Sequence, residues 1–123
     1  DTVVPRAYLS ELLRLVKECG SKDGFRSVCY GHAVDGNLHI NILKDGLTED
    51  FWNNKLPDTI RAIFMFVHSL GGTISGEHGI GYVQKEFMDI VFPKTHLELM
   101  QKIKNVFDSK GILNPGKILP TVG

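Results

Sequence analysis

The sequence has no excess of charge of either sign, since 14 Lys and Arg residues stand against 14 Asp and Glu residues and the formal net charge is zero. A strongly basic surface for nucleic acid or for an acidic membrane is therefore not expected. Long apolar runs are also missing: the longest covers residues 62–67, far short of the ~20 residues that a transmembrane helix needs. We expect a chain that does not span a membrane.

Cysteine is scarce as well. Cys19 and Cys29 lie outside any Cys-x-x-Cys pair and are too few for a disulfide scaffold, which indicates a reducing compartment. We therefore expect a cytoplasmic protein that meets a membrane, if at all, only at its periphery. The sequence opens on Asp1 rather than on Met and has no basic and then apolar leader, which indicates a piece of a longer protein.

The overall composition is typical of one globular domain. Of the 123 residues, 42% are apolar and 23% are charged. Apolar spacing predicts a helix over residues 6–19, ended by Gly20. Richness in Val, Cys and Tyr predicts a strand over 26–33, and alternation of apolar and polar residues predicts another over 38–43. With the helices that follow, the order predicts an α+β domain.

Three further helices are expected after residue 47. Thr48 is predicted to cap a short helix, which Pro57 interrupts before Asp58 caps a second helical stretch. Residues 95–98 have the Thr-x-x-Glu form of a capping box and predict a last helix, closed by Gly111. The stripe of that helix expected to be buried comprises Leu97, Met100, Ile103 and Phe107.

A glycine-rich loop is predicted after the helical stretch that begins at Asp58. The loop has glycine at five of the eleven positions from 71 to 81, more than a simple connector requires. Something is therefore expected to approach its backbone closely. In the same loop, Glu77 and His78 place a carboxylate beside an imidazole.

The Asp35-Gly36 pair between the two predicted strands predicts a hairpin with a two-residue loop. This register pairs His32 with His39 and Tyr30 with Asn41, all on one face of the sheet. The opposite face then collects the residues expected in the core, which are Cys29, Gly31, Ala33, Leu38, Ile40 and Ile42. A three-residue loop would place the two histidines on opposite faces, so the hypothesis depends on the register.

Two neutral imidazoles and the Glu77 carboxylate are nitrogen and oxygen donors that suit Zn, Mn or Fe and leave positions open for a substrate. The alternative is that His32 and His39 are unrelated, one satisfied by hydrogen bonds and one solvated, and that Glu77-His78 is only a polar turn pair. A small zinc hydrolase has the same ligands, but no substrate cleft is evident in so short a chain.

Three segments, taken together, resemble the C-terminal domain of FAD-linked oxidases. They are His32-Ala-Val-Asp-Gly-Asn-Leu-His39-Ile-Asn41, Gly71-Gly-Thr-Ile-Ser-Gly-Glu77-His78-Gly-Ile-Gly81 and Gly111-Ile-Leu-Asn-Pro-Gly-Lys-Ile118. The family includes the flavin-dependent component of glycolate oxidase, D-lactate dehydrogenase and D-2-hydroxyglutarate dehydrogenase, in the vanillyl-alcohol oxidase fold group. Members commonly have glycine where this chain has Val34, a difference that removes no donor.

The resemblance implies a role for each residue of the site. His32, His39 and Glu77 are implied to hold a divalent ion, Zn or Mn, while His78 acts as the base and Asn41 contacts substrate. The implied reaction is oxidation of a D-2-hydroxy acid, such as glycolate or D-lactate, with hydride transfer to FAD. The small 2-hydroxy acid is the expected ligand, and no nucleic-acid partner is expected.

The resemblance also implies an antiparallel sheet flanked by helices, forming a substrate cap over a flavin domain. Residues 1–123 are then the C-terminal substrate and cap domain, and the flavin domain of the same polypeptide, which binds most of the FAD, is absent from this chain. The fragment alone is expected to be inactive and, through exposed apolar surface, to form a homodimer.

Asn114 and Lys117 are expected to contact FAD or its domain; the alternative is a plain turn that stops a helix. The rival reading of the whole chain is a stand-alone α+β binding or interaction module with structural histidines.

Overall fold

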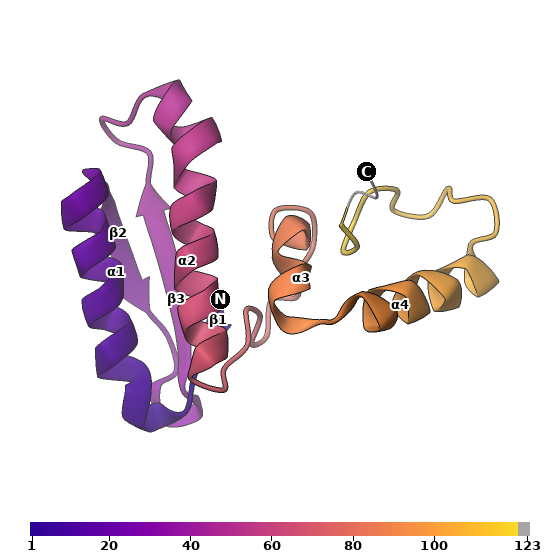
Figure 1. The fold of residues 1–123 in the computed structure, drawn as a ribbon, viewed down its shortest axis with the longest axis horizontal. Helices are drawn as coiled ribbons and strands as arrows, with labels where there is room; N and C mark the ends of the chain where they lie inside the picture. The colour runs from indigo at the N-terminus through magenta and orange to yellow at the C-terminus, as the bar shows by residue number, and fades with distance from the viewer. Residues whose placement is uncertain (121–123) are drawn as a thin grey trace. The chain divides into compact units, whose positions relative to one another are not determined.

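The structure, a computed structural model, describes residues 1–120 and consists of two compact units, Asp1–His78 and a second unit that begins at Gly79. The first unit contains an antiparallel sheet in the order β1-β3-β2 and two long helices (Figure 1). Its elements are β1 (Thr2–Val3), α1 (Leu9–Asp23), β2 (Arg26–Tyr30), β3 (Asn37–Leu43) and α2 (Leu56–Ser69). The predicted α+β class, with an antiparallel sheet and flanking helices, is confirmed.

Helices α1 and α2 lie against one face of the sheet (Figure 1). The buried core comprises Val4, Leu12, Val16, Leu38, Ile63 and Val67. Each helix contributes two core residues one turn apart, which therefore project from the same side of the helix. Because successive side chains of a strand point to opposite faces, the contact of Leu38 with the helices turns His39 to the other face.

The first helix extends further than the sequence predicts. It follows a 3₁₀ turn, η1 (Arg6–Tyr8), and ends where Gly24 adopts a left-handed conformation with φ of 78°. The predicted end at Gly20 is wrong because Gly20 lies inside the helix and serves close packing. A Cβ atom at Gly20 would lie 2.7 Å from the carbonyl oxygen of Phe25.

The second long helix is continuous with the short helix predicted before it. The Thr48 hydroxyl accepts a hydrogen bond from the Phe51 N–H at 3.1 Å, as a capping residue does. A π-helical turn, η3 (Phe51–Lys55), then leads directly into α2. The predicted interruption at Pro57 is wrong because the proline lies in the first turn of α2, after the wider π turn, and Asp58 lies inside the helix.

The β2–β3 hairpin has a four-residue loop and not the predicted two-residue loop. His32 and Asn37 exchange backbone hydrogen bonds of 3.1 and 3.2 Å, and the register pairs Tyr30 with His39. The predicted register is wrong because residues 33–35 form a 3₁₀ turn, η2 (Ala33–Asp35), and Gly36 closes the loop in the left-handed conformation. The Asp-Gly pair therefore ends the loop instead of forming its centre.

The observed register differs from the predicted register by two residues, so each side chain lies on its predicted face of the sheet. His32 and His39 lie on the same face as diagonal neighbours instead of directly opposite each other. Asn41 is paired with Val28 instead of Tyr30. Two residues expected in the core, Gly31 and Ala33, are exposed because the chain leaves the sheet there.

The glycine-rich loop runs beside β1. Val3 and Thr73 exchange backbone hydrogen bonds of 3.0 and 2.9 Å, and the Gly76 N–H donates to the backbone oxygen of Asp1 at 3.3 Å. A Cβ atom at Gly76 would lie 2.2 Å from Nδ2 of Asn37. The close approach predicted for this loop therefore comes from β1 and β3 of the same chain.

The second unit contains a 3₁₀ turn, η4 (Lys85–Phe87), and the helices α3 (Met88–Val91) and α4 (Lys94–Phe107). The predicted capping box at Thr95 is wrong, because α4 begins before Thr95. Its N-cap residue is Pro93, which has an extended backbone. The helix ends at Phe107 rather than at Gly111, and the Asp108 carboxylate accepts the N–H groups of Ile112 and Leu113.

The apolar stripe of α4 is not buried as predicted. The side chains of Ile103 and Phe107 are 53% and 82% exposed. The homodimer expected from exposed apolar surface stays a prediction. Within residues 1–120, every helix is too short or too polar to cross a bilayer.

Candidate functional site

The first unit brings the three predicted metal ligands together on the sheet face opposite the helices. Oε1 of Glu77 lies 3.4 Å from Nε2 of His32 and 3.2 Å from Nε2 of His39. The ligand atoms of all three residues lie within 4.8 Å of one another. His32 follows β2, His39 belongs to β3 and Glu77 belongs to the glycine-rich loop, so three separate segments form the cluster.

These separations fit a divalent metal ion. Ligand atoms ~2.1 Å from a tetrahedral zinc ion lie about 3.4 Å from one another, close to the measured distances. Two imidazole nitrogens and one carboxylate oxygen are also a common donor set for Zn and Mn. The geometry is therefore suitable for an ion, and the role of the three residues as ligands stays a prediction.

His39 is the buried member of the cluster and His78 covers it. The His39 side chain is only 7% exposed, whereas those of His32, Glu77 and His78 are half exposed or more. The rings of His39 and His78 stack with 4.5 Å between centroids and 9° between planes. Nε2 of His78 lies 4.0 Å from Oε1 of Glu77, so the predicted base stands beside the predicted ligands with its imidazole exposed.

Asn41 lies on the same face, two residues from His39 along β3. Its Nδ2 donates a hydrogen bond of 3.2 Å to the hydroxyl of Tyr30, whose ring lies 5.2 Å from that of His39. The amide is exposed and held beside the imidazoles. This position is compatible with the predicted contact to substrate.

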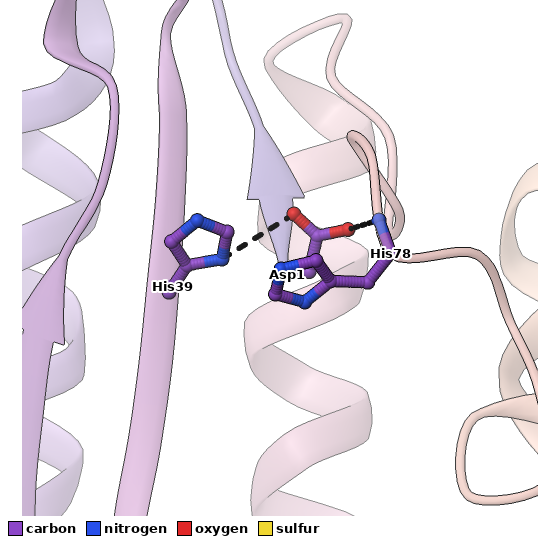
Figure 2. A group of neighbouring side chains, drawn as sticks. All are labelled: Asp1, His39 and His78. Carbon is purple, nitrogen blue, oxygen red and sulfur yellow. Dashed lines mark hydrogen bonds and ion pairs between the residues drawn. The ribbon is translucent and has the colours of Figure 1, made fainter.

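Asp1, which was not among the predicted site residues, lies in the same cluster with its side chain 3% exposed. Its Oδ2 accepts the backbone N–H groups of Gly76, Glu77 and His78 at 3.0, 3.0 and 2.8 Å. Its Oδ1 lies 3.5 Å from Nδ1 of His39, and Figure 2 shows the carboxylate between that ring and the backbone of His78. No local pattern marks Asp1, because β1 is two residues long and pairs with strands and loops distant in sequence.

Asp1, His39 and His78 form a second group whose atoms are close enough to share a metal ion. Hydrogen-bond donors, however, already occupy Oδ2 of Asp1 fully and Oδ1 in part. Three N–H groups fill Oδ2, and Oδ1 accepts the Asn37 amide at 3.0 Å. A carboxylate with one oxygen fully occupied in this way is an anchor for the loop, and the His32, His39 and Glu77 set is the better candidate for a metal.

The two residues predicted to contact the flavin, Asn114 and Lys117, belong to the second unit. Both are exposed, and Lys117 donates its backbone N–H to the Asn114 carbonyl in a turn. The Lys117 ammonium lies 4.9 Å from the centre of the Tyr82 ring. Their contact with FAD or its domain stays a prediction.

Comparison with known proteins identifies the family of the chain. A family model described as "FAD linked oxidases, C-terminal domain" matches residues 1–118. The chain belongs to this family. The match includes every residue of the cluster, from Asp1 to His78, and also the Asn114 to Lys117 turn.

Curated relatives of this FAD-linked oxidase C-terminal domain include three named hydroxy-acid enzymes. The chain is 40% identical over 119 residues to a D-lactate dehydrogenase of Archaeoglobus fulgidus and 38% identical over 113 residues to a D-2-hydroxyglutarate dehydrogenase of Stutzerimonas stutzeri. It is 32% identical over 118 residues to the glycolate oxidase subunit GlcD of Bacillus subtilis. These alignments cover 97%, 91% and 96% of this chain but only 26%, 24% and 25% of the relatives. The chain thus spans about a quarter of their length.

Proposed function

We propose that this chain is the metal- and substrate-binding part of a flavin-dependent dehydrogenase that acts on a D-2-hydroxy acid such as glycolate or D-lactate. The observation that carries the proposal is the position of Glu77 Oε1, 3.4 and 3.2 Å from the Nε2 atoms of two histidines. Membership of the FAD-linked oxidase family and the names of its relatives supply the reaction class.

In this proposal His32, His39 and Glu77 hold Zn²⁺ or Mn²⁺. When bound, the ion supplies a Lewis acid that favours ionisation of the substrate hydroxyl. His39 is the ligand held rigidly, because it is buried and stacked on His78. The exposed sides of His32 and Glu77 leave room for the carboxylate and hydroxyl oxygens of a 2-hydroxy acid.

His78 is the proposed general base. Its imidazole, exposed and 4.0 Å from Glu77, takes the hydroxyl proton at a ring nitrogen, a role typically worth ~10²–10⁴-fold in rate. FAD, when bound, would supply a hydride acceptor for C2, so that with the proton taken by His78 the substrate would lose two electrons and two hydrogens in total. Asn41, held by Tyr30 on the same face, contacts the substrate.

The flavin belongs, in this proposal, to a further domain of the same polypeptide, with Asn114 and Lys117 contacting FAD or that domain. In this proposal, the chain has no oxidoreductase activity without the flavin domain. A cytoplasmic location stays a prediction.

Metal titration of the 123-residue chain tests the donor set. We expect Co²⁺, used as a spectroscopic substitute, and Zn²⁺ to bind one site. His39→Ala and Glu77→Ala should each weaken binding by more than the ~10–100-fold typical of losing an outer-shell partner. His96→Ala is the matched control, since it removes an exposed histidine of the second unit and should leave the affinity unchanged.

Folding of each variant is checked by circular dichroism. Equal affinity in wild type and Glu77→Ala would contradict the three-ligand site. No binding by a folded wild-type chain would favour the stand-alone module with structural histidines.

Activity is tested in a polypeptide that joins this chain to a flavin domain. D-Lactate or glycolate should reduce the flavin, and a chelator should abolish the reduction. Chelator-insensitive reduction would exclude the metal role of His32 and His39.

A further inference from the structure

Asp1 is a buried carboxylate that connects two parts of the site. Three successive backbone N–H groups, those of Gly76, Glu77 and His78, donate to its Oδ2. A buried charge needs such partners, because burial without them is costly. The same three donors fix the backbone from which the Glu77 and His78 side chains project.

The other oxygen of Asp1 faces His39. Nδ1 of His39 is buried and has no hydrogen-bond partner among the described residues, while Oδ1 of Asp1 lies 3.5 Å away as the nearest ion-pair partner. A shift of about 0.5 Å would bring the two atoms to ordinary hydrogen-bond distance. The opposite ring nitrogen, Nε2, faces Glu77 at 3.2 Å.

We propose that Asp1 is a positioning residue that holds the proton of His39 on Nδ1 and so directs the lone pair of Nε2 toward Glu77. This inference rests on the proposed function, in which Nε2 binds a metal ion. A histidine ligand whose other ring nitrogen donates to a carboxylate is fixed in tautomer and orientation and becomes more basic. Asp1 thereby holds the strand histidine and the loop residues in one arrangement.

The hydrogen bond from Asn37 strengthens the assignment. Its Nδ2 donates to the same Oδ1 at 3.0 Å, and Asn37 is itself buried, so the carboxylate cannot turn away from His39 without losing a buried partner. Ser75 also approaches Oδ2, at 3.3 Å from its hydroxyl.

The direct test is the tautomer of His39 in the wild-type 123-residue chain, read from long-range ¹H–¹⁵N NMR correlations at a pH well above the ordinary histidine pKa of about 6.5. We expect the Nδ1–H form to predominate without added metal. Predominance of the Nε2–H form would overturn the inference whether or not the chain binds metal, so its failure is distinct from a failure of the proposed function.

The Asp1→Asn variant tests the consequence for the site. An amide has one acceptor oxygen where the carboxylate has two, so it cannot satisfy all the donors. Co²⁺ affinity is expected to fall by ~10–100-fold, and His39 to shift toward the other tautomer. Glu18→Gln is the matched control, because it removes an exposed carboxylate of α1 that pairs with Arg14, and it should change neither readout.

An Asp1→Asn chain that is folded and binds Co²⁺ like wild type would overturn the inference. If this variant fails to fold, the tautomer measured in the wild-type chain still decides the question.

Discussion

Replacing Gly76 with alanine is expected to weaken metal binding through a steric conflict under the glycine-rich loop. A Cβ atom at this position would lie 2.2 Å from Nδ2 of Asn37 and 2.7 Å from Cγ2 of Val3. Ordinary contacts begin near 3.4 Å, so the Asn37 amide has to retreat by about 1.2 Å or the loop has to rise by a similar distance. Either movement disturbs the Asn37–Asp1 hydrogen bond and the position of Glu77.

The loss of stability expected for Gly76→Ala is about 1–3 kcal/mol, the usual cost of overpacking a close contact. Metal affinity should fall by about tenfold or more, the lower limit for disturbing an outer-shell partner. Gly71→Ala is the matched control: nothing lies within 4 Å of its added Cβ, but its φ of 78° is left-handed. That change costs a similar ~1–2 kcal/mol by backbone strain alone.

The assay is Co²⁺ titration of both variants, with urea unfolding of each to measure its stability. Two variants of similar stability should then differ in metal affinity, with Gly76→Ala weaker and Gly71→Ala close to wild type. Equal affinities would refute the reasoning, because they would mean that contact between the loop and Asn37 does not determine the position of Glu77.

Two further predictions concern stability. Leu12→Ala, which empties a fully buried position of α1, should cost about 2–5 kcal/mol in urea unfolding, and a loss below about 1 kcal/mol would contradict the packed core. The hydrogen bond from Lys104, supported by two backbone N–H groups, holds the pKa of Asp108 below its ordinary value. A carboxylate with a depressed pKa stabilises the fold at pH values above its ordinary pKa. It loses this contribution as the pH falls through its pKa in the folded state. Asp108→Asn should therefore flatten the loss of helical circular dichroism below pH ~4; an unchanged acid profile would refute this account.

The hairpin illustrates how far the sequence could predict the site. The face shared by His32 and His39 was predictable, because alternation along each strand places them there for any loop of even length. The loop length was not predictable from Asp35-Gly36 alone, since Asp-Gly fits both the centre of a two-residue turn and the end of a four-residue loop. The 3₁₀ turn of residues 33–35, which makes the loop four residues long, is seen only in the folded chain.

The predicted helix boundaries were wrong for a related reason. Gly20 and Gly24 are both plausible stop residues, and packing of Gly20 against Phe25 selects the second. Pro57 is a helix breaker by local rules, but the π turn before it lets the helix continue. In each case a tertiary or neighbouring contact outweighs the local preference.

Asp1 was beyond sequence reasoning altogether. Its partners lie 36 to 77 positions away, and its strand is too short to show alternation. A single sequence gives no signal that one aspartate among 14 acidic residues is buried.

The adjacency of Glu77 and His78 has a consequence for how such a site can vary. One peptide segment supplies both the carboxylate proposed to bind the ion and the imidazole proposed to accept the proton, and a single buried aspartate anchors that segment. Sequence changes that loosen the anchor would alter both ion binding and proton abstraction. Selection could therefore change ion binding alone by acting on His32 or His39.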